Sequence, residues 1–214
     1  MLGVRPATRS ARPTTTMLRM MLALLLVLVA GCSSGSSGAT SEAPPATDPS
    51  PPLVYVAMGG IETLNSDRDD LPDNWPQIVL AEHLPAGAVY VNLATEGGTV
   101  KSGLDGQLPE ARDLHATVAT IWFESADLRL GTATRVYHDE LATLVEDLQA
   151  DGVKVVLVRS GVWIGDPPPL PATVAVVAGD TGATLVDLGD ISDRNDDAGQ
   201  RRIATQVAAA IGAG

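Results

Sequence analysis

The amino-acid sequence predicts an α/β fold, a three-layer sandwich in which helices cover both faces of a doubly wound, parallel, five-stranded sheet. Five short apolar runs alternate with helical stretches through residues 53–214. Such an alternation favours parallel strands joined by right-handed crossovers. The runs are almost continuously apolar, as is typical of strands that are buried on both faces.

Each element is predicted from its local pattern. The expected strands cover residues 53–58, 88–92, 117–123, 153–158 and 184–187, and the expected helices cover 76–84, 135–150, 173–178 and 197–211. Pro76 occupies the first position of its helix, where its missing N–H is no loss. The helix at 135–150 is expected to bury one apolar face, formed by Val136, Leu141, Leu144, Val145 and Leu148. The last helix is expected to bury Ile203, Val207 and Ile211.

Residues 1–31 have the features of a lipoprotein signal peptide. Four arginines precede a leucine-rich run at 20–30, which is shorter than the roughly 20 residues that span a bilayer. The run ends in Val29-Ala30-Gly31-Cys32 and resembles the lipobox of bacterial lipoproteins, in which the cysteine is acylated and becomes the new N-terminus. Cys32 is the only cysteine of the chain. Acylation explains why an exported protein has a single cysteine that cannot form an internal disulfide. The alternative is an uncleaved anchor helix with an incidental cysteine.

Residues 32–52 are expected to form a lipid-anchored tether, and residues 53–214 one folded domain. The tether consists almost entirely of Ser, Gly, Ala, Thr and Pro and has no apolar period, so it cannot form a core. A chain of about 20 such residues has a root-mean-square reach of roughly 25 Å. We therefore expect a domain held at the cell membrane, on its extracytoplasmic side, through its N-terminal lipid.

The net charge of the chain excludes nucleic acids as partners. Without the four arginines of the signal peptide, 10 Lys and Arg face 26 Asp and Glu, a net charge of −16. Such a surface repels nucleic acid and anionic lipid head groups. We expect no nucleic-acid role, no cofactor and a monomer.

Four segments, in order, resemble the sequence blocks of the SGNH (GDSL-type) hydrolases. They are residues 55–63 (YVAMGGIET), 92–99 (NLATEGGT), 107–109 with 118–128 (QLP and VATIWFESADL), and 197–204 (DAGQRRIA). The resemblance runs from about 53 to 211. It implies the SGNH hydrolase fold, a flavodoxin-like sandwich whose ligands bind beyond the carboxyl ends of the strands.

The resemblance also implies catalytic residues, and here the sequence departs from the family. The family uses a serine nucleophile, a histidine near the C-terminus, and oxyanion donors that include a second-block glycine and a third-block asparagine. The corresponding positions hold Ile61 for the serine, Arg194 for the histidine, Gly97 for the glycine, Ala126 for the asparagine, Glu124 for the third-block glycine and Ile191 for the aspartate before the histidine. Losing the serine or the histidine alone costs on the order of 10⁶ in turnover, so we expect little hydrolysis.

Other residues do not readily replace the missing groups. The histidines are His83, His115 and His138, and none follows the fifth expected strand. Ser125 and Ser160 lie at the expected ligand edge, but a serine without a base is a poor nucleophile. We interpret both as ordinary loop serines.

Many carboxylates follow the expected strand ends. They are Glu62, Asp67, Asp69, Asp70, Glu96, Glu124, Asp127, Asp166, Asp190, Asp193 and Asp196. Such acids can hold Ca²⁺ or Mg²⁺, attract a cationic amine or peptide, or be solvated loop residues. We expect no metal, because no dense Asp-x-Asp-x-Asp spacing occurs, and favour a weak cationic or peptide ligand. The candidate ligand edge comprises Glu62, Glu96, Glu124, Ser125, Asp127, Trp163 and Asp190. Trp163 either lines a pocket there or caps the core.

Two main hypotheses follow. The first is a membrane-tethered, non-catalytic binding or accessory module on the SGNH scaffold. The second is an active esterase or carbohydrate deacetylase that uses rearranged residues. A purely structural role in the cell envelope is a further alternative.

Overall fold

The predicted sheet is confirmed in the computed structural model, which describes residues 52–64, 74–161, 169–189, 191 and 195–212. Its strands are all parallel and lie in the order β2-β1-β3-β4-β5. They are β1 (Val54–Gly59), β2 (Val89–Asn92), β3 (Val118–Trp122), β4 (Lys154–Ser160) and β5 (Thr184–Leu188). Each differs from its predicted range by no more than two residues at either end.

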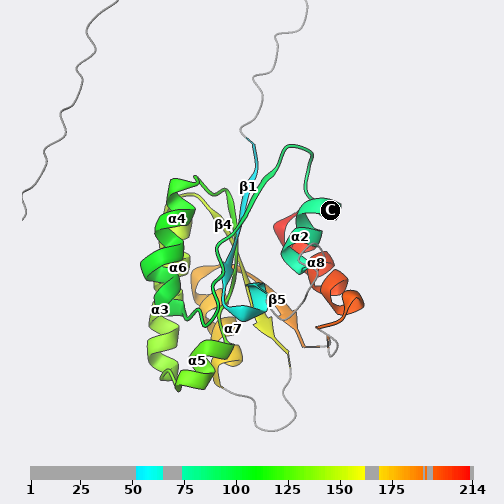
Figure 1. Ribbon diagram of the computed structural model, residues 1–214. Helices are drawn as coiled ribbons and strands as arrows, with labels where there is room; N and C mark the ends of the chain where they lie inside the picture. The colour runs from blue at the N-terminus through cyan, green and yellow to red at the C-terminus, as the bar shows by residue number, and fades with distance from the viewer. Residues whose placement is uncertain (1–51, 65–73, 162–168, 190, 192–194, 213–214) are drawn as a thin grey trace, which may run out of the picture. The chain divides into compact units, whose positions relative to one another are not determined.

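Helices cover both faces of this sheet (Figure 1). The helices are α1 (Ile61–Leu64), α2 (Trp75–Ile78) with the π-helical turn η2 (Val79–His83), α3 (Val100–Ser102) with the π-helical turn η3 (Gly103–Gln107), α4 (Leu108–Asp113), α5 (Ser125–Leu130), α6 (Thr134–Ala150), α7 (Pro169–Thr181) and α8 (Asp197–Ile211). One layer contains α3, α4, α6 and α7, and the opposite layer contains α2 and α8.

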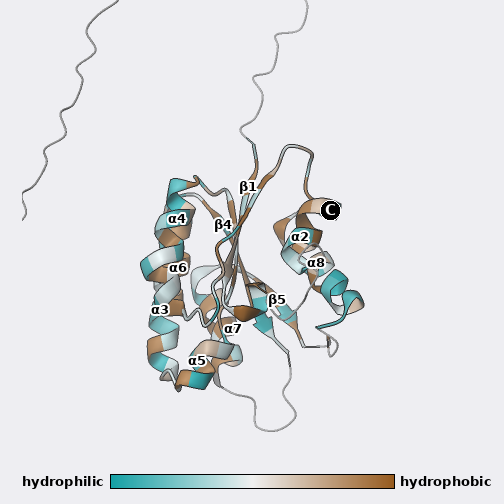
Figure 2. Cartoon of the chain, in the orientation of Figure 1, coloured by the Kyte–Doolittle hydropathy of each residue, from teal (hydrophilic) through white to brown (hydrophobic). Residues whose placement is uncertain are grey.

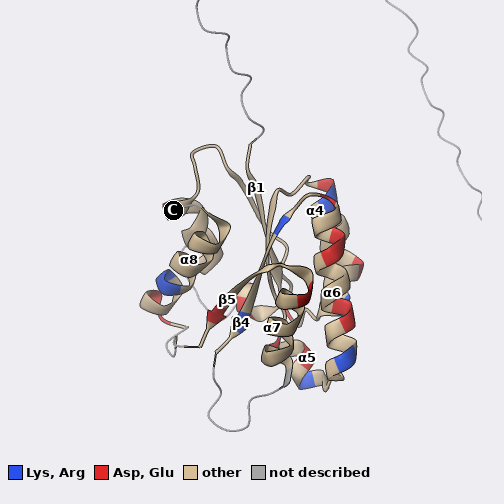
Figure 3. Ribbon diagram, turned by 180° about the vertical axis from the view of Figure 1, so that it is seen from behind, with Lys and Arg blue, Asp and Glu red and all other residues tan. Residues whose placement is uncertain are grey.

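Two apolar cores separate the three layers. Along β1, Val56 and Met58 pack toward the layer of α6 and α7, whereas Tyr55 and Ala57 pack toward α2 and α8. This alternation follows from the two-residue period of a strand. Figure 2 shows the result as an apolar sheet between helices that are polar on their outer sides, and Figure 3 shows the charged residues gathered on those helices.

The predicted helices agree with the structure except in α6 and α7. Val136 was expected on the buried face of α6, but its side chain is 47% exposed, and Tyr137 is buried instead. The stripe that faces the sheet is Tyr137, Leu141, Leu144, Val145 and Leu148, which continues the i, i+4, i+7, i+8, i+11 spacing of one helix face. Val136 lies one residue before the first member of this stripe and is not part of it. Helix α7 runs over 13 residues and is longer than the predicted 173–178.

The strand order places a topological switch point between β1 and β3. The connection from β1 leads to β2 on one side, and the next strand of the chain, β3, lies on the other side of β1. In sheets of this kind the crevice beyond the carboxyl ends of such strands holds the ligand. No helix in the described part of the chain combines the length and the apolar character needed to cross a bilayer.

Candidate functional site

The turn that follows β1 is held tightly. A Cβ atom on Gly59 would lie 2.4 Å from Thr63 Oγ1 and 2.4 Å from the carbonyl oxygen of Trp122. The side-chain amide of Gln107 makes two hydrogen bonds to the backbone of Gly59. Gln107 Oε1 accepts the N–H of Gly59 at 2.9 Å, and Gln107 Nε2 donates to the carbonyl oxygen of Gly59 at 3.0 Å. The chain therefore passes from β1 into α1 in one fixed conformation, with Ile61 as the first residue of that helix.

The loop after β2 is joined to this turn. The N–H of Thr95 donates to the carbonyl oxygen of Gly59 at 3.2 Å, and Asn92 Nδ2 donates to the carbonyl of Thr63 at 3.2 Å. Gly97 has a φ of 68°, a left-handed conformation that glycine adopts without steric cost. The loop thus brings the backbone of Gly97 to the switch point.

The segment after β3 completes the edge. Asp127 is buried, and its Oδ2 accepts the N–H of Val100 at 3.0 Å while its Oδ1 accepts the hydroxyl of Thr132 at 2.8 Å. The bond from Val100 joins the start of α5 to the start of α3, and the bond from Thr132 joins it to the turn that follows α5. Ser125 and Ser160 were interpreted as loop serines, but Ser125 begins α5 and Ser160 ends β4.

A hollow of about 480 Å³ opens where these segments meet. Its walls are formed by Ile61, Glu96, Gly97, Ala126 and Arg129. Ile61 occupies the expected nucleophile position, and Gly97 and Ala126 occupy the expected oxyanion positions, so the structure brings these three positions to one hollow. Glu96, an acid of the candidate ligand edge, lies there too. None of the five lining residues is a serine or a histidine.

Two glutamates join the turns around this hollow. Glu62 Oε1 accepts the N–H of Ser125 at 2.6 Å, and its Oε2 is buried without a hydrogen-bond partner in the described part of the chain. Glu124 is 2% exposed, and both its oxygens accept the N–H of Ser160, at 3.0 and 3.1 Å. Burial raises the pKa of Glu124, the nearby Glu62 carboxylate raises it further, and the hydrogen bonds from Ser160 lower it.

Several residues of the sequence predictions lie outside the described residues. Among them are Cys32, Trp163, Asp190, Arg194 and the acids Asp67, Asp69, Asp70, Asp166 and Asp193. Ile191 is described and is buried in the core beside α8. His83 ends η2 and His138 lies on α6.

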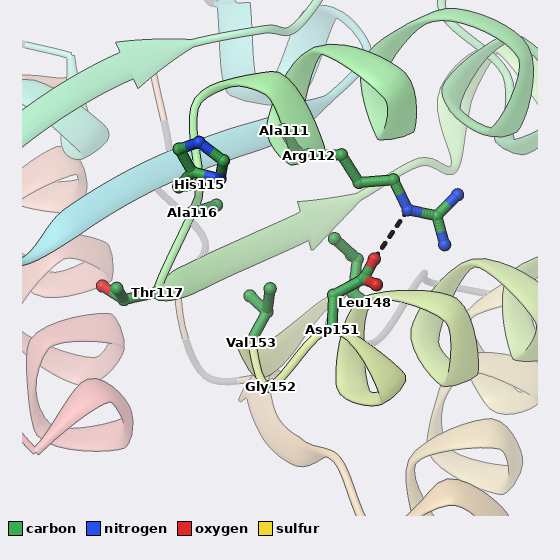
Figure 4. A pocket seen from close by; sticks show the side chains of 9 residues that line it. All are labelled: Ala111, Arg112, His115, Ala116, Thr117, Leu148, Asp151, Gly152 and Val153. Atoms are coloured by element: carbon green, nitrogen blue, oxygen red, sulfur yellow. Dashed lines mark hydrogen bonds and ion pairs between the residues drawn. The ribbon is translucent and has the colours of Figure 1, made fainter.

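A second hollow, of about 510 Å³, lies at the opposite edge of the sheet, where β3 and β4 begin (Figure 4). His115 lines it, so this histidine lies at the end of the sheet away from the switch point. The one guanidinium there is already neutralised, because Arg112 Nε donates to Asp151 Oδ2 at 2.6 Å. Of the positions named by the family resemblance, Ile61, Gly97 and Ala126 line the first hollow.

Comparison with known proteins identifies the fold. The sequence matches no protein-family model and no curated protein. Among solved structures, the psychrotrophic esterase EstA from Pseudoalteromonas sp. superimposes with a TM-score of 0.62 at 15% identity, over 74% of this chain and 96% of that one. A G-D-S-L family protein from Desulfitobacterium hafniense gives 0.61 at 11% identity, over 74% and 99%. An acetyl xylan esterase, AlAXEase, gives 0.63 at 10% identity, over 74% and 100%. The chain has the SGNH hydrolase fold.

Within the SGNH fold, one residue of the site was not predicted from the sequence. Arg129 lines the hollow three residues after Ala126, and on a helix residues three apart share a face. The spacing was visible, but no helix was predicted over 125–130, so it could not be used. Gln107 was part of the family resemblance, but its clamp on Gly59 depends on a contact across 48 residues.

Proposed function

We propose that this protein is a membrane-tethered lipoprotein whose SGNH-type domain binds a ligand without hydrolysing it. One observation carries the proposal: the hollow at the switch point is lined at the expected nucleophile and asparagine positions by Ile61 and Ala126. An isoleucine side chain offers no lone pair for attack, and an alanine side chain offers no proton to an oxyanion. The lipid anchor at Cys32 rests on the lipobox resemblance.

The Glu62 carboxylate opposes the formation of an oxyanion next to the asparagine position. An oxyanion needs positive or hydrogen-bond-donating groups as it forms. The N–H of Ser125, next to the asparagine position, is instead bound by the Glu62 carboxylate. A developing negative charge near that carboxylate would be destabilised, whereas a cationic ligand would be stabilised. This favours a ligand that carries a positive group.

The alternative function is an esterase or carbohydrate deacetylase with rearranged residues. It is supported by the solved structures, which include two esterases, and by Ser125, which is partly exposed and adjoins Ala126. In the described part of the chain, no hydrogen bond joins Ser125 or Ser160 to a histidine. A serine hydroxyl without a base reacts slowly.

Hydrolysis assays on the purified protein distinguish the two functions. Short and medium p-nitrophenyl esters and an acetylated sugar would be tested with the unmodified protein, Ile61→Ser, Ser125→Ala and Ser160→Ala, beside an active serine esterase as positive control. We expect no turnover above buffer and no labelling by a fluorophosphonate. Ile61→Ser is also expected to be almost inactive, since lack of the histidine alone costs on the order of 10⁶.

Turnover by the unmodified protein would refute the proposal. Loss of that turnover in Ser125→Ala or Ser160→Ala would identify a displaced nucleophile. Turnover that both variants retain, without fluorophosphonate labelling, would point to a carboxylate.

A further inference from the structure

Two opposite charges line the hollow at the switch point without neutralising each other. Glu96, in the loop after β2, and Arg129, on α5, make no ion pair or hydrogen bond with each other or with any other described residue. Four other arginines are each paired with a carboxylate: Arg112, Arg135, Arg159 and Arg201.

The rest of the hollow is open. Ile61 is half-buried and contributes a hydrocarbon side chain, whereas Ala126 is 4% exposed and adds little surface. No heavy atom lies within 4 Å of the position that a Cβ of Gly97 would occupy, so a ligand can approach the backbone of that loop. The hollow therefore offers one anionic group, one cationic group and the hydrocarbon side chain of Ile61, in a volume within the usual range for small-molecule sites.

We propose that this hollow binds a small zwitterion that carries an ammonium group and a carboxylate, such as an amino acid or a short peptide. Arg129 receives the carboxylate, because a guanidinium donates two hydrogen bonds to it in a fixed geometry. Glu96 receives the ammonium group, and the field of Glu62 adds to that preference. The hydrocarbon part of the ligand lies against Ile61. This inference rests on the proposed binding function and names its ligand class.

Binding to a graded series of ligands tests the inference. The full-length protein in detergent would be titrated by calorimetry with glycine, β-alanine, 4-aminobutyrate and 6-aminohexanoate, and with a dipeptide, against butylamine and butyrate as singly charged controls. We expect the best zwitterion to bind roughly two- to fivefold more tightly than either control, since only it engages both charges. Glu96→Gln and Arg129→Gln should each weaken binding of that zwitterion by roughly two- to fivefold, a range typical of exposed charge pairs.

Matched variants on the helices separate a local effect from a change in net charge. Glu110→Gln on α4 and Arg135→Gln on α6 alter equally exposed residues away from the hollow, and they should leave the affinity unchanged. The inference is wrong if no zwitterion binds more tightly than butylamine and butyrate, or if Glu96→Gln and Arg129→Gln bind like the unmodified protein. Ester hydrolysis would be measured on the same preparation. Absence of turnover together with absence of zwitterion binding would overturn this inference alone, whereas turnover would overturn the proposed function.

Discussion

At the scale of single residues, Glu124 is the most unusual group near the hollow. It is 2% exposed and lies close to a second carboxylate, Glu62. Burial penalises the charged form, and the neighbouring negative charge adds to the penalty. Because the pKa of Glu124 is raised in the folded protein, the folded state holds a proton that the unfolded chain releases more readily.

This linkage predicts how stability depends on pH. The contribution of Glu124 to the free energy of unfolding is fully present below the pKa of the unfolded chain, near 4.5. It is lost as the pH rises through the pKa of the folded protein, at up to about 1.4 kcal/mol per pH unit. We expect Glu124→Gln to flatten the dependence of the unfolding free energy between pH 5 and pH 8, because the amide is neutral and its oxygen can still accept from Ser160. Urea unfolding at both pH values measures this. An unchanged slope in Glu124→Gln would contradict the prediction, and Glu110→Gln provides an exposed control.

The composition of the hollow was only partly predictable from the sequence. The family resemblance placed Ile61, Gly97 and Ala126 in segments that end neighbouring strands, and the structure brings these residues to one space. Arg129 was missed because its role depends on a short helix. Glu124 was expected at the ligand edge and lies buried beneath it, since sequence position fixes the edge of the sheet but not the depth of a side chain.

At the scale of elements, prediction succeeded where a periodic pattern was long. The strands were found from their apolar runs, and α8 was predicted with its observed bounds from its long apolar stripe. In the structure, Asp196 also caps this helix by accepting the N–H of Gly199. Helices α1, α3 and α5 have three to six residues, which is too short for a period to emerge. Such helices depend on tertiary hydrogen bonds, like those from Val100 to Asp127 and from Ser125 to Glu62.

The face of α6 gives a matched pair of variants. Leu144→Ala removes a fully buried side chain from the core, and we expect it to lower the unfolding free energy by about 2–5 kcal/mol. Val136→Ala changes a side chain that is 47% exposed and should alter it by no more than about 0.5 kcal/mol. Chemical denaturation of both variants measures the difference. Equal losses would mean that the buried face of α6 is not the one described.

At the scale of the whole molecule, the proposed lipid anchor predicts the N-terminus and the mass of the mature protein. The mature protein should begin at Cys32 and carry a mass increment of several acyl chains, because a lipobox cysteine is acylated and then exposed by cleavage. Intact-mass measurement of protein from a bacterial host checks this. Cys32→Ser should lose the acyl mass, whereas Ser33→Ala should retain it. A wild-type mass equal to that of the unmodified chain would exclude the anchor.

The strand order has a mechanical consequence. The folded domain is entered at Val54, and the hollow lies beyond Gly59, at the other end of the same strand, β1. A tension between an anchored N-terminus and a partner held in the hollow would therefore act along β1. Because β1 is hydrogen-bonded to β2 on one side and to β3 on the other, such a load would have to shear two ladders at once and could not peel a single edge strand. The fold thus places a strand that is paired on both sides between the proposed point of attachment and the proposed binding site.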